Sequence, residues 1–439
     1  MIDFASCLSE RLGFLGTRVE ALSRDYARIW RTTPAGPFNP DRLYSTPEKK
    51  QVERELSALI SRLSAEKKKL NPDGRSWEQG ELEKFAESLR PFFKSLLARL
   101  GLRLDAVYDS RFVESTRQFL RTARDFDPEI GIASVYQALR NVWIMNTLQF
   151  YLGKKVEPTD AIFGYSMVYP YLDNFLDDER EAESEKLSLV RRLKGWLEGV
   201  DRRAETPREQ KLHVLISTIE RQYPRGSFPG VFQSMLAILN AQIKSLLQQR
   251  EANPPDPAGI LAISLEKGGT SVLADGYLVA GNLEPEEQDF CFGFGTFLQL
   301  ADDLQDVQED LGHGHRTVFS CAAGKSPLDP LVYRLCRYVS AVVERTLGKS
   351  RAQEQAALKE VIPQSCVLMY MESVGKHPFF FSKSCVRGFQ KAFPVRFSYL
   401  RKLRRALPDT LLTGREKIRE LDPLSAALMA VSSRAFTLD

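Results

Sequence analysis

The chain has 439 residues, of which 43% are hydrophobic and 27% are charged, a composition typical of folded globular proteins. Its 61 basic and 57 acidic residues leave a net charge of +4, which argues against nucleic acid or an anionic membrane as the main partner. Because no apolar run reaches the length of a membrane span, we expect no transmembrane segment.

The number and spacing of the cysteines and histidines limit the kinds of site that the chain can form. The six cysteines are widely spaced and form no Cys-x-x-Cys pair, which is typical of free thiols in a reducing compartment. The amino-terminal residues also lack the pattern of a secretory signal, so we expect a cytoplasmic protein. There are only four histidines, so carboxylates and cations must carry most of any chemistry.

Helical periodicity dominates the chain and strand-like alternation is almost absent, which predicts an all-α fold. The first predicted helix spans 47–70, with Ser45 and Thr46 as N-cap candidates and Pro47 in its first turn. Cap and turn signals delimit the later helices, and Thr159 with Asp160 is one such cap signal. Their predicted ranges are 80–100, 110–124, 128–152, 159–182, 184–200, 206–223, 228–250, 257–281, 284–311, 327–347, 351–373, 378–405 and 416–435.

The first 105 residues differ from the rest. They contain a proline-rich segment at 32–42 and a lysine-rich segment at 65–70, and they have no aspartate cluster. We interpret 1–105 as an N-terminal helical extension that packs on a main helical domain, 106–439. The basic, amphipathic stretch 393–407 is interpreted as a helix whose basic side faces solvent.

A first acidic cluster follows an apolar run. Asp173 and Asp177 are four residues apart and therefore share one helical face, and Asp178 is adjacent. Carboxylates at the end of a buried helix are costly unless a cation lies between them. Mg²⁺ satisfies that need and also favours phosphate oxygens as ligands. Pro170 predicts a kink one turn before these acids.

A second acidic cluster ends another apolar helix, in which Gly293 and Gly295 permit close packing. Three of its aspartates have i, i+4, i+8 spacing and a fourth flanks them. The four residues are Asp302, Asp303, Asp306 and Asp310. Either cluster alone is compatible with a solvated helix end. Two such clusters, each ending an apolar helix, indicate two acidic walls that face one cavity, with metals and a diphosphate between them.

Three further features lie near these clusters. Lys267 is a candidate point charge for a diphosphate, although an ordinary surface lysine is the alternative. Gly268 and Gly269 cost about 1 kcal/mol each inside a helix, so they predict a helix break, a close approach to ligand or a packing contact. Arg316 follows the acidic stripe in a loop that either closes over the site or merely connects helices.

These motifs resemble a known family. The segment 267–270 together with QLADDLQD at 299–306 looks like the second half of trans-polyprenyl diphosphate synthases, which pairs a lysine-threonine helix with a Q-x-x-D-D-x-x-D helix. The Asp173 cluster stands where that family has its first aspartate-rich motif. The resemblance covers residues 130–320. It implies a class I isoprenoid synthase-type helical bundle that binds a prenyl diphosphate through three Mg²⁺ ions.

The resemblance also assigns roles to individual residues. Diphosphate binding falls to Lys267, Gln299 and Arg316. The implied metal ligands are Asp173, Asp177, Asp178, Asp302, Asp303, Asp306 and Asp310. Of these, the residues expected to be catalytic are Asp173, Asp177, Asp302 and Asp306.

Departures from the family pattern indicate which reaction to expect. The first motif reads D-x-x-x-D-D. In chain-elongating synthases a pair of arginines follows this motif closely. Here the next such pair, Arg191 and Arg192, lies too far along the chain to take that place. The upstream Gly-Lys-Arg element is also missing; ALRNVWIMN (138–146) occupies that region. Without cations for a second diphosphate, ionisation of one prenyl diphosphate followed by cyclisation or elimination is favoured. This is the reaction of a terpene synthase.

Three alternatives stay open. One is a chain-elongating prenyltransferase. Another is a head-to-head squalene- or phytoene-type synthase, because QLADDLQDVQEDLGHGHR is similar to an element of those enzymes, with His315 in place of its arginine. The third is a non-catalytic helical interaction protein with a vestigial site. Among partners, we expect a prenyl diphosphate and no nucleic acid, and a homodimer is left open.

Overall fold

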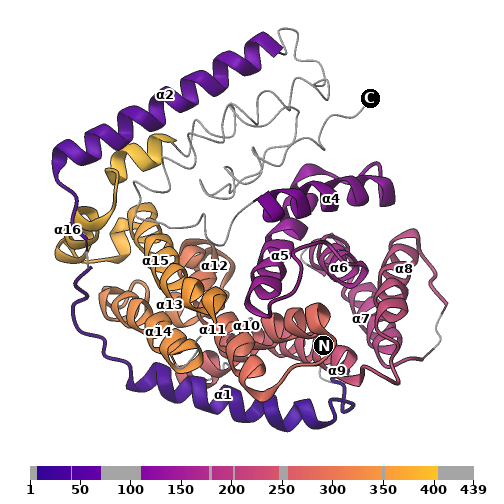
Figure 1. Ribbon diagram of the computed structural model, residues 1–439. Helices are drawn as coiled ribbons and strands as arrows, with labels where there is room; N and C mark the ends of the chain where they lie inside the picture. The colour runs from indigo at the N-terminus through magenta and orange to yellow at the C-terminus, as the bar shows by residue number, and fades with distance from the viewer. Residues whose placement is uncertain are drawn as a thin grey trace. The chain divides into compact units, whose positions relative to one another are not determined.

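The computed structural model describes most of the chain, and Figure 1 shows the arrangement of its helices. The described residues are 7–40, 42–70, 110–176, 180–200, 203–246, 256–348 and 352–403. Within them every regular element is helical and no strand occurs, which confirms the all-α prediction. No helix in these ranges has the length and apolarity needed to cross a membrane. The predicted helices at 80–100 and 416–435 lie outside the described residues.

The chain divides into two compact units, each described by itself. The first comprises Met1–Phe38, Thr147–Lys155 and Thr159–Cys366, and the second comprises Asn39–Asn146, Val156–Pro158 and Val367–Asp439. The first unit therefore includes amino-terminal residues that the sequence division assigned to the extension 1–105. A boundary at residue 105 stays a prediction, because 71–109 lie outside the described residues.

Most described helices belong to the first unit. They are α1 (Phe14–Thr32), α6 (Asp160–Leu176), α7 (Glu183–Leu197), α8 (Pro207–Gln222), α9 (Pro229–Ser245), α10 (Pro257–Ala280), α11 (Pro285–Gln305), α12 (Val307–His313), α13 (Val318–Ala322) and α14 (Asp329–Leu347). The second unit contains α2 (Thr46–Leu70), α4 (Ser110–Phe126), a 3₁₀ turn (Pro378–Phe380) and α16 (Lys383–Ala392). Two helices contribute residues to both units, α5 (Ile132–Tyr151) and α15 (Gln353–Lys376).

Two helices begin at caps that the sequence predicts. Ser45 Oγ accepts a hydrogen bond from the Glu48 backbone N–H at 3.4 Å, and Glu48 Oε2 accepts one from the Ser45 N–H at 2.7 Å. This reciprocal capping box starts α2 and leaves Pro47 in the first turn. At the start of α6, the Thr159 hydroxyl accepts a hydrogen bond from the Ile162 N–H at 3.4 Å.

The second unit is held together by buried charges of α2. The Lys49 ammonium donates to the carbonyl oxygens of Gln390 and Phe393, at the end of α16, where a cation is favoured by the helix dipole. Arg396, from the basic carboxyl-terminal stretch, is paired with Glu53, with 2.6 Å between Nη2 and Oε2. As predicted for the basic side of this stretch, Arg396, Arg401 and Lys402 are exposed. Arg396 also neutralises the Glu53 carboxylate, which is almost fully buried.

In the first unit, α10 and α11 lie side by side and make its most extensive helix pair (Figure 1). A Cβ added to Gly295 would lie 1.9 Å from the carbonyl oxygen of Gly268, so the two backbones are in direct contact there. A Cβ on Gly269 would lie 2.4 Å from the ring of Phe292. Since α10 runs through this glycine pair without interruption, the helix-break alternative is wrong, and the packing contact is the alternative that is observed.

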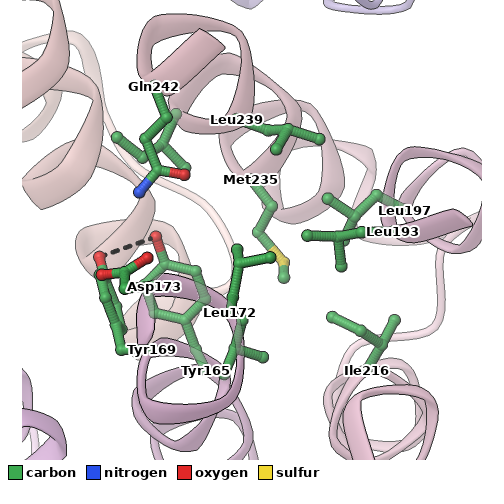
Figure 2. Close-up of a pocket in the computed structure, with 12 residues that line it drawn as sticks. Tyr165, Tyr169, Leu172, Asp173, Leu193, Leu197, Ile216, Met235, Leu239 and Gln242 are labelled. Carbon is green, nitrogen blue, oxygen red and sulfur yellow. Dashed lines mark hydrogen bonds between the residues drawn. The ribbon is translucent and has the colours of Figure 1, made fainter. Parts of the chain in front are cut away.

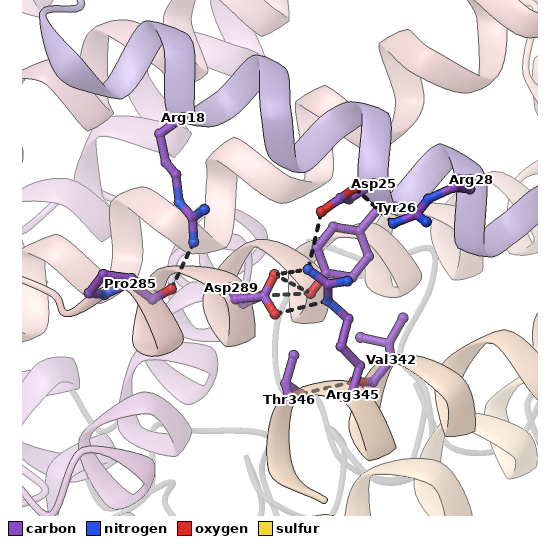
Figure 3. A network of polar contacts seen from close by, with 9 residues as sticks. All are labelled: Arg18, Asp25, Tyr26, Arg28, Pro285, Asp289, Val342, Arg345 and Thr346. Carbon is purple, nitrogen blue, oxygen red and sulfur yellow. Dashed lines mark hydrogen bonds and ion pairs between the residues drawn. The ribbon is translucent and has the colours of Figure 1, made fainter.

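Helix α1 was not among the predicted helices, and it packs against α10, α11 and α14. The Tyr26 hydroxyl donates to the Asp289 carbonyl oxygen at 2.7 Å, and Gly293 leaves room for it. Arg345 on α14 lies between two carboxylates, 2.9 Å from Asp289 Oδ2 and 3.3 Å from Asp25 Oδ2 (Figure 3). This network joins α1, α11 and α14.

The α10–α11 contact makes Gly295→Ala a direct test of the packing. We expect the substitution to lower the free energy of unfolding by about 3 kcal/mol or more, since backbone rather than a flexible side chain must move. Urea unfolding followed by circular dichroism measures this change. The matched control is Gly388→Ala in α16, where an added Cβ meets nothing within 4 Å and helix propensity favours alanine by about 1 kcal/mol. Equal stability of Gly295→Ala and the wild type would contradict the packing described here.

Candidate functional site

The α10–α11 pair brings several of the predicted site residues together. Asp303 on α11 is only 5% exposed, and its Oδ1 accepts a hydrogen bond from Gln299 Nε2 at 2.8 Å. The pKa of Asp303 is raised to about 6, mainly by burial and also by the neighbouring Asp302, whereas the hydrogen bond from Gln299 lowers it. Ser264 and Lys267, both on α10, also lower this pKa, so they lie close to the carboxylate.

The remaining oxygen of Asp303 indicates what this cluster can bind. Its Oδ2 is buried and has no hydrogen bond of normal geometry, which is costly for a carboxylate. A divalent cation between Asp302 and Asp303 would remove that cost, and oxygen donors suit Mg²⁺. No group of three or more metal-ligating side chains forms among the described residues, so a metal at this position stays a prediction.

The second half of the acidic stripe has a different environment. Instead of one helix over 284–311, the structure has two, because α11 ends one residue before Asp306 and α12 begins one residue after it. The Asp310 carboxylate lies 3.2 Å from His315 Nδ1 and accepts a hydrogen bond from the Thr317 hydroxyl at 3.3 Å. Asp310 thus fixes the turn that leads into α13, and metal binding by Asp306 and Asp310 stays a prediction.

Asp173 lies on α6 at the edge of an apolar pocket (Figure 2). The pocket lies between α6, α7, α8 and α9 and has a cavity volume of about 30 Å³. Its apolar lining consists of Val168, Leu172, Leu193, Leu197, Ile216, Met235, Ile238 and Leu239. Its polar lining consists of Tyr165, Tyr169, Asp173 and Gln242. Asp177 and Asp178, the other acids of the first cluster, lie outside the described residues.

A pair of tyrosines connects the pocket with α10. The Tyr169 hydroxyl donates to the Tyr165 hydroxyl at 3.3 Å and lies 3.4 Å from Ser271 Oγ. Their rings meet edge to face, with 5.4 Å between centroids. Ser271 is one helical turn beyond Lys267, so the polar side of the pocket continues along α10 toward the Asp303 cluster.

Several members of the site were missed by sequence reasoning. Ser264, Ser271 and Asp275 recur at helical spacing along the otherwise apolar α10, and this polar stripe is a signal that was available. Gln242 lies on α9, where the sequence offers no comparable pattern. Arg316, predicted to bind diphosphate, is half-buried in the turn between α12 and α13.

Comparisons of the chain with protein-family models, with curated proteins and with solved structures gave no match. The interpretation of this site therefore depends on its own residues and their geometry.

The raised pKa of Asp303 predicts how stability depends on pH. A carboxyl whose pKa is about 6 when folded binds its proton more tightly in the folded state, so its contribution to stability falls as pH rises from about 4 to above 6. In metal-free buffer, Asp303→Asn should raise the free energy of unfolding at pH 7 by at most about 3 kcal/mol and change it little at pH 4.

Urea unfolding at both pH values tests this expectation. Glu309→Gln is the control, because Glu309 is exposed on α12 and its removal changes the net charge equally. An Asp303→Asn protein that is less stable than the wild type at pH 7 in the presence of a chelator would contradict the assigned environment.

Proposed function

We propose that this chain is a class I terpene synthase, which ionises one prenyl diphosphate with the help of Mg²⁺ and then cyclises the hydrocarbon or eliminates a proton. One observation carries the proposal. The close contact of α10 and α11 gathers Lys267, Gln299, Asp302 and Asp303 into one cluster, which combines a cation, an amide and two carboxylates. Such a set of groups suits a diphosphate with its bound metal.

The chain's own residues account for the other requirements of the reaction. Asp302 and Asp303 would hold Mg²⁺, with Asp173 as a ligand from α6. When bound, the metal would neutralise the charge that develops on the departing diphosphate. Lys267 adds a positive charge on the same side, and Gln299 holds the Asp303 carboxylate in place through its hydrogen bond.

The pocket suits the hydrocarbon part of such a substrate. Its walls are mainly aliphatic, so they would contact a prenyl chain and keep water from a reactive cation. The rings of Tyr165 and Tyr169 stand at the polar side of the pocket, where an aromatic face attracts positive charge. The proposed active site therefore has two parts. Groups on α10 and α11 would bind the metal and the diphosphate, and the pocket beside α6 would bind the hydrocarbon.

Chain elongation is a second candidate, and a cluster of cations favours it. The Lys186 ammonium donates to the Leu176 carbonyl oxygen at 2.6 Å, at the end of α6. The Arg208 guanidinium lies 4.1 Å from the centroid of the Phe175 ring, and Lys211 lies on the same helix one turn later. These cations, from α7 and α8, would offer a second diphosphate some of the positive charge that the missing paired arginines supply in elongating enzymes.

Substitution of the acids tests the proposed reaction. Asp173→Ala and Asp302→Ala should each lower turnover of a prenyl diphosphate by at least about 100-fold, because each removes a ligand that acts on the leaving group. Turnover is measured by gas chromatography and mass spectrometry with C10, C15 and C20 prenyl diphosphates and Mg²⁺. Glu309→Gln is the control, and circular dichroism verifies that each variant is folded. Wild-type turnover in both alanine variants would exclude this site.

The products distinguish the alternatives. A hydrocarbon or alcohol formed from a single substrate supports the terpene synthase, and a longer diphosphate formed only when isopentenyl diphosphate is added supports elongation. Coupling of two identical substrates indicates a head-to-head synthase. A folded protein that consumes none of these substrates would favour the non-catalytic interaction protein.

A further inference from the structure

A stripe of exposed cations runs along α16 in the second unit. Lys383, Arg387 and Lys391 follow one another at i, i+4, i+8 spacing, so they share one face of the helix, and all three are exposed. The opposite face, which includes Cys385 and Phe389, is buried. Arg387 Nε donates to the Lys383 carbonyl oxygen at 3.1 Å, and within the described residues none of the three cations forms an ion pair with a carboxylate.

The segment around this stripe carries charge of one sign. Residues 376–403 contain seven lysines and arginines and no acidic residue. Glu53, which reaches the segment from α2, is almost fully buried and is already paired with Arg396. The net charge of +4 conceals this local excess, because acidic residues elsewhere in the chain offset it. The exposed face of α16 is therefore a surface that attracts anions.

An exposed apolar side chain lies at each end of the stripe. Phe379, in the 3₁₀ turn just before α16, is 65% exposed, and Leu43 is 62% exposed, the two largest values for large hydrophobic side chains in the described part of the chain. Leu43 lies beside the far end of α16, because the N–H of the adjoining Tyr44 donates to the Lys391 carbonyl oxygen at 2.9 Å. The Phe379 ring packs on Phe380, with 4.3 Å between centroids, which supports its position.

We propose that the exposed face of α16, together with Phe379 and Leu43, is a docking surface for an anionic phospholipid bilayer. Its cations face the lipid phosphates, and the two apolar side chains enter the boundary between headgroups and acyl chains. Nucleic acid offers the same negative charge but no apolar layer for Phe379 and Leu43, so the bilayer suits both features of the surface. The inference goes beyond the proposed function and does not depend on it, because no residue of this surface belongs to the α10–α11 cluster or to the pocket.

Vesicle co-sedimentation of the full-length protein tests the docking surface. Vesicles of phosphatidylcholine alone are compared with vesicles in which about 30% of the lipid is phosphatidylserine. The wild type should bind the anionic vesicles at least about 20-fold more tightly than the neutral ones, and raising NaCl from about 0.1 M to about 0.5 M should remove most of this preference.

Two variants separate the charge from the apolar contact. The triple variant Lys383→Gln, Arg387→Gln, Lys391→Gln should weaken binding to anionic vesicles by at least about 30-fold, since each cation near such a surface contributes about fivefold. Phe379→Ser leaves the charge unchanged and should weaken binding to the same vesicles by about fivefold. Circular dichroism verifies that both variants are folded.

A matched control on α1 removes the same number of exposed cations. In Arg24→Gln, Arg28→Gln, Arg31→Gln the net charge falls equally, but Arg24 and Arg28 are paired with Glu20 and Asp25 of their own helix. This variant should bind both kinds of vesicle as the wild type does.

Several results would overturn the inference. Equal binding of the wild type to the two kinds of vesicle, or binding to neither, would do so. So would anionic-vesicle binding that both α16-surface variants leave unchanged, or that the α1 variant weakens as much as the triple variant does. A duplex oligonucleotide that binds more tightly than the anionic vesicles, and equally well to Phe379→Ser and the wild type, would assign the surface to nucleic acid instead.

Discussion

The direct contact between the backbones of α10 and α11 is the constraint on which the rest of the site depends. Only glycine at 268 and 295 allows this approach, since a single Cβ would collide with the facing carbonyl or side chain. The contact places Gln299, which follows Gly295 by one turn, against Gly268 and next to Lys267. Side chains from two helices, separated by more than thirty residues of sequence, thereby form one polar cluster in a bundle that is otherwise apolar.

Burial of charge in this bundle is tolerated because neighbouring groups partly offset its cost. Gln299, Ser264 and Lys267 favour the ionised form of Asp303, but burial outweighs them and its pKa remains raised. Asp275, one turn beyond Ser271 on the same helix, is fully buried. A polar stripe along α10 thus joins the two parts of the site. Buried carboxylates of this kind are typical of positions where a cationic ligand or a metal ion binds and neutralises the charge.

The sequence predicted those parts of the structure that depend on local signals. Helical periodicity and the caps at Ser45 and Thr159 located α2 and α6, and the small residues at 293 and 295 indicated close packing. Helix α1 was not predicted, in part because Gly13 before it offers no side-chain cap. The division of the acidic stripe at Asp306 depends on tertiary contacts of Asp310 in the following turn, which spacing alone cannot reveal. Similarly, the pocket arises only when α6, α7, α8 and α9 pack together.

The central claim is that the α10–α11 cluster is a metal and diphosphate site. Its most direct test is a crystal structure of the protein with Mn²⁺ and inorganic diphosphate, in which anomalous scattering locates the metal. We expect an anomalous peak at coordination distance from Asp302 or Asp303, about 2.0–2.1 Å for a Mg²⁺-like ion, with diphosphate density at Lys267. Diphosphate and Mn²⁺ bound elsewhere, with these carboxylates free of metal, would contradict it.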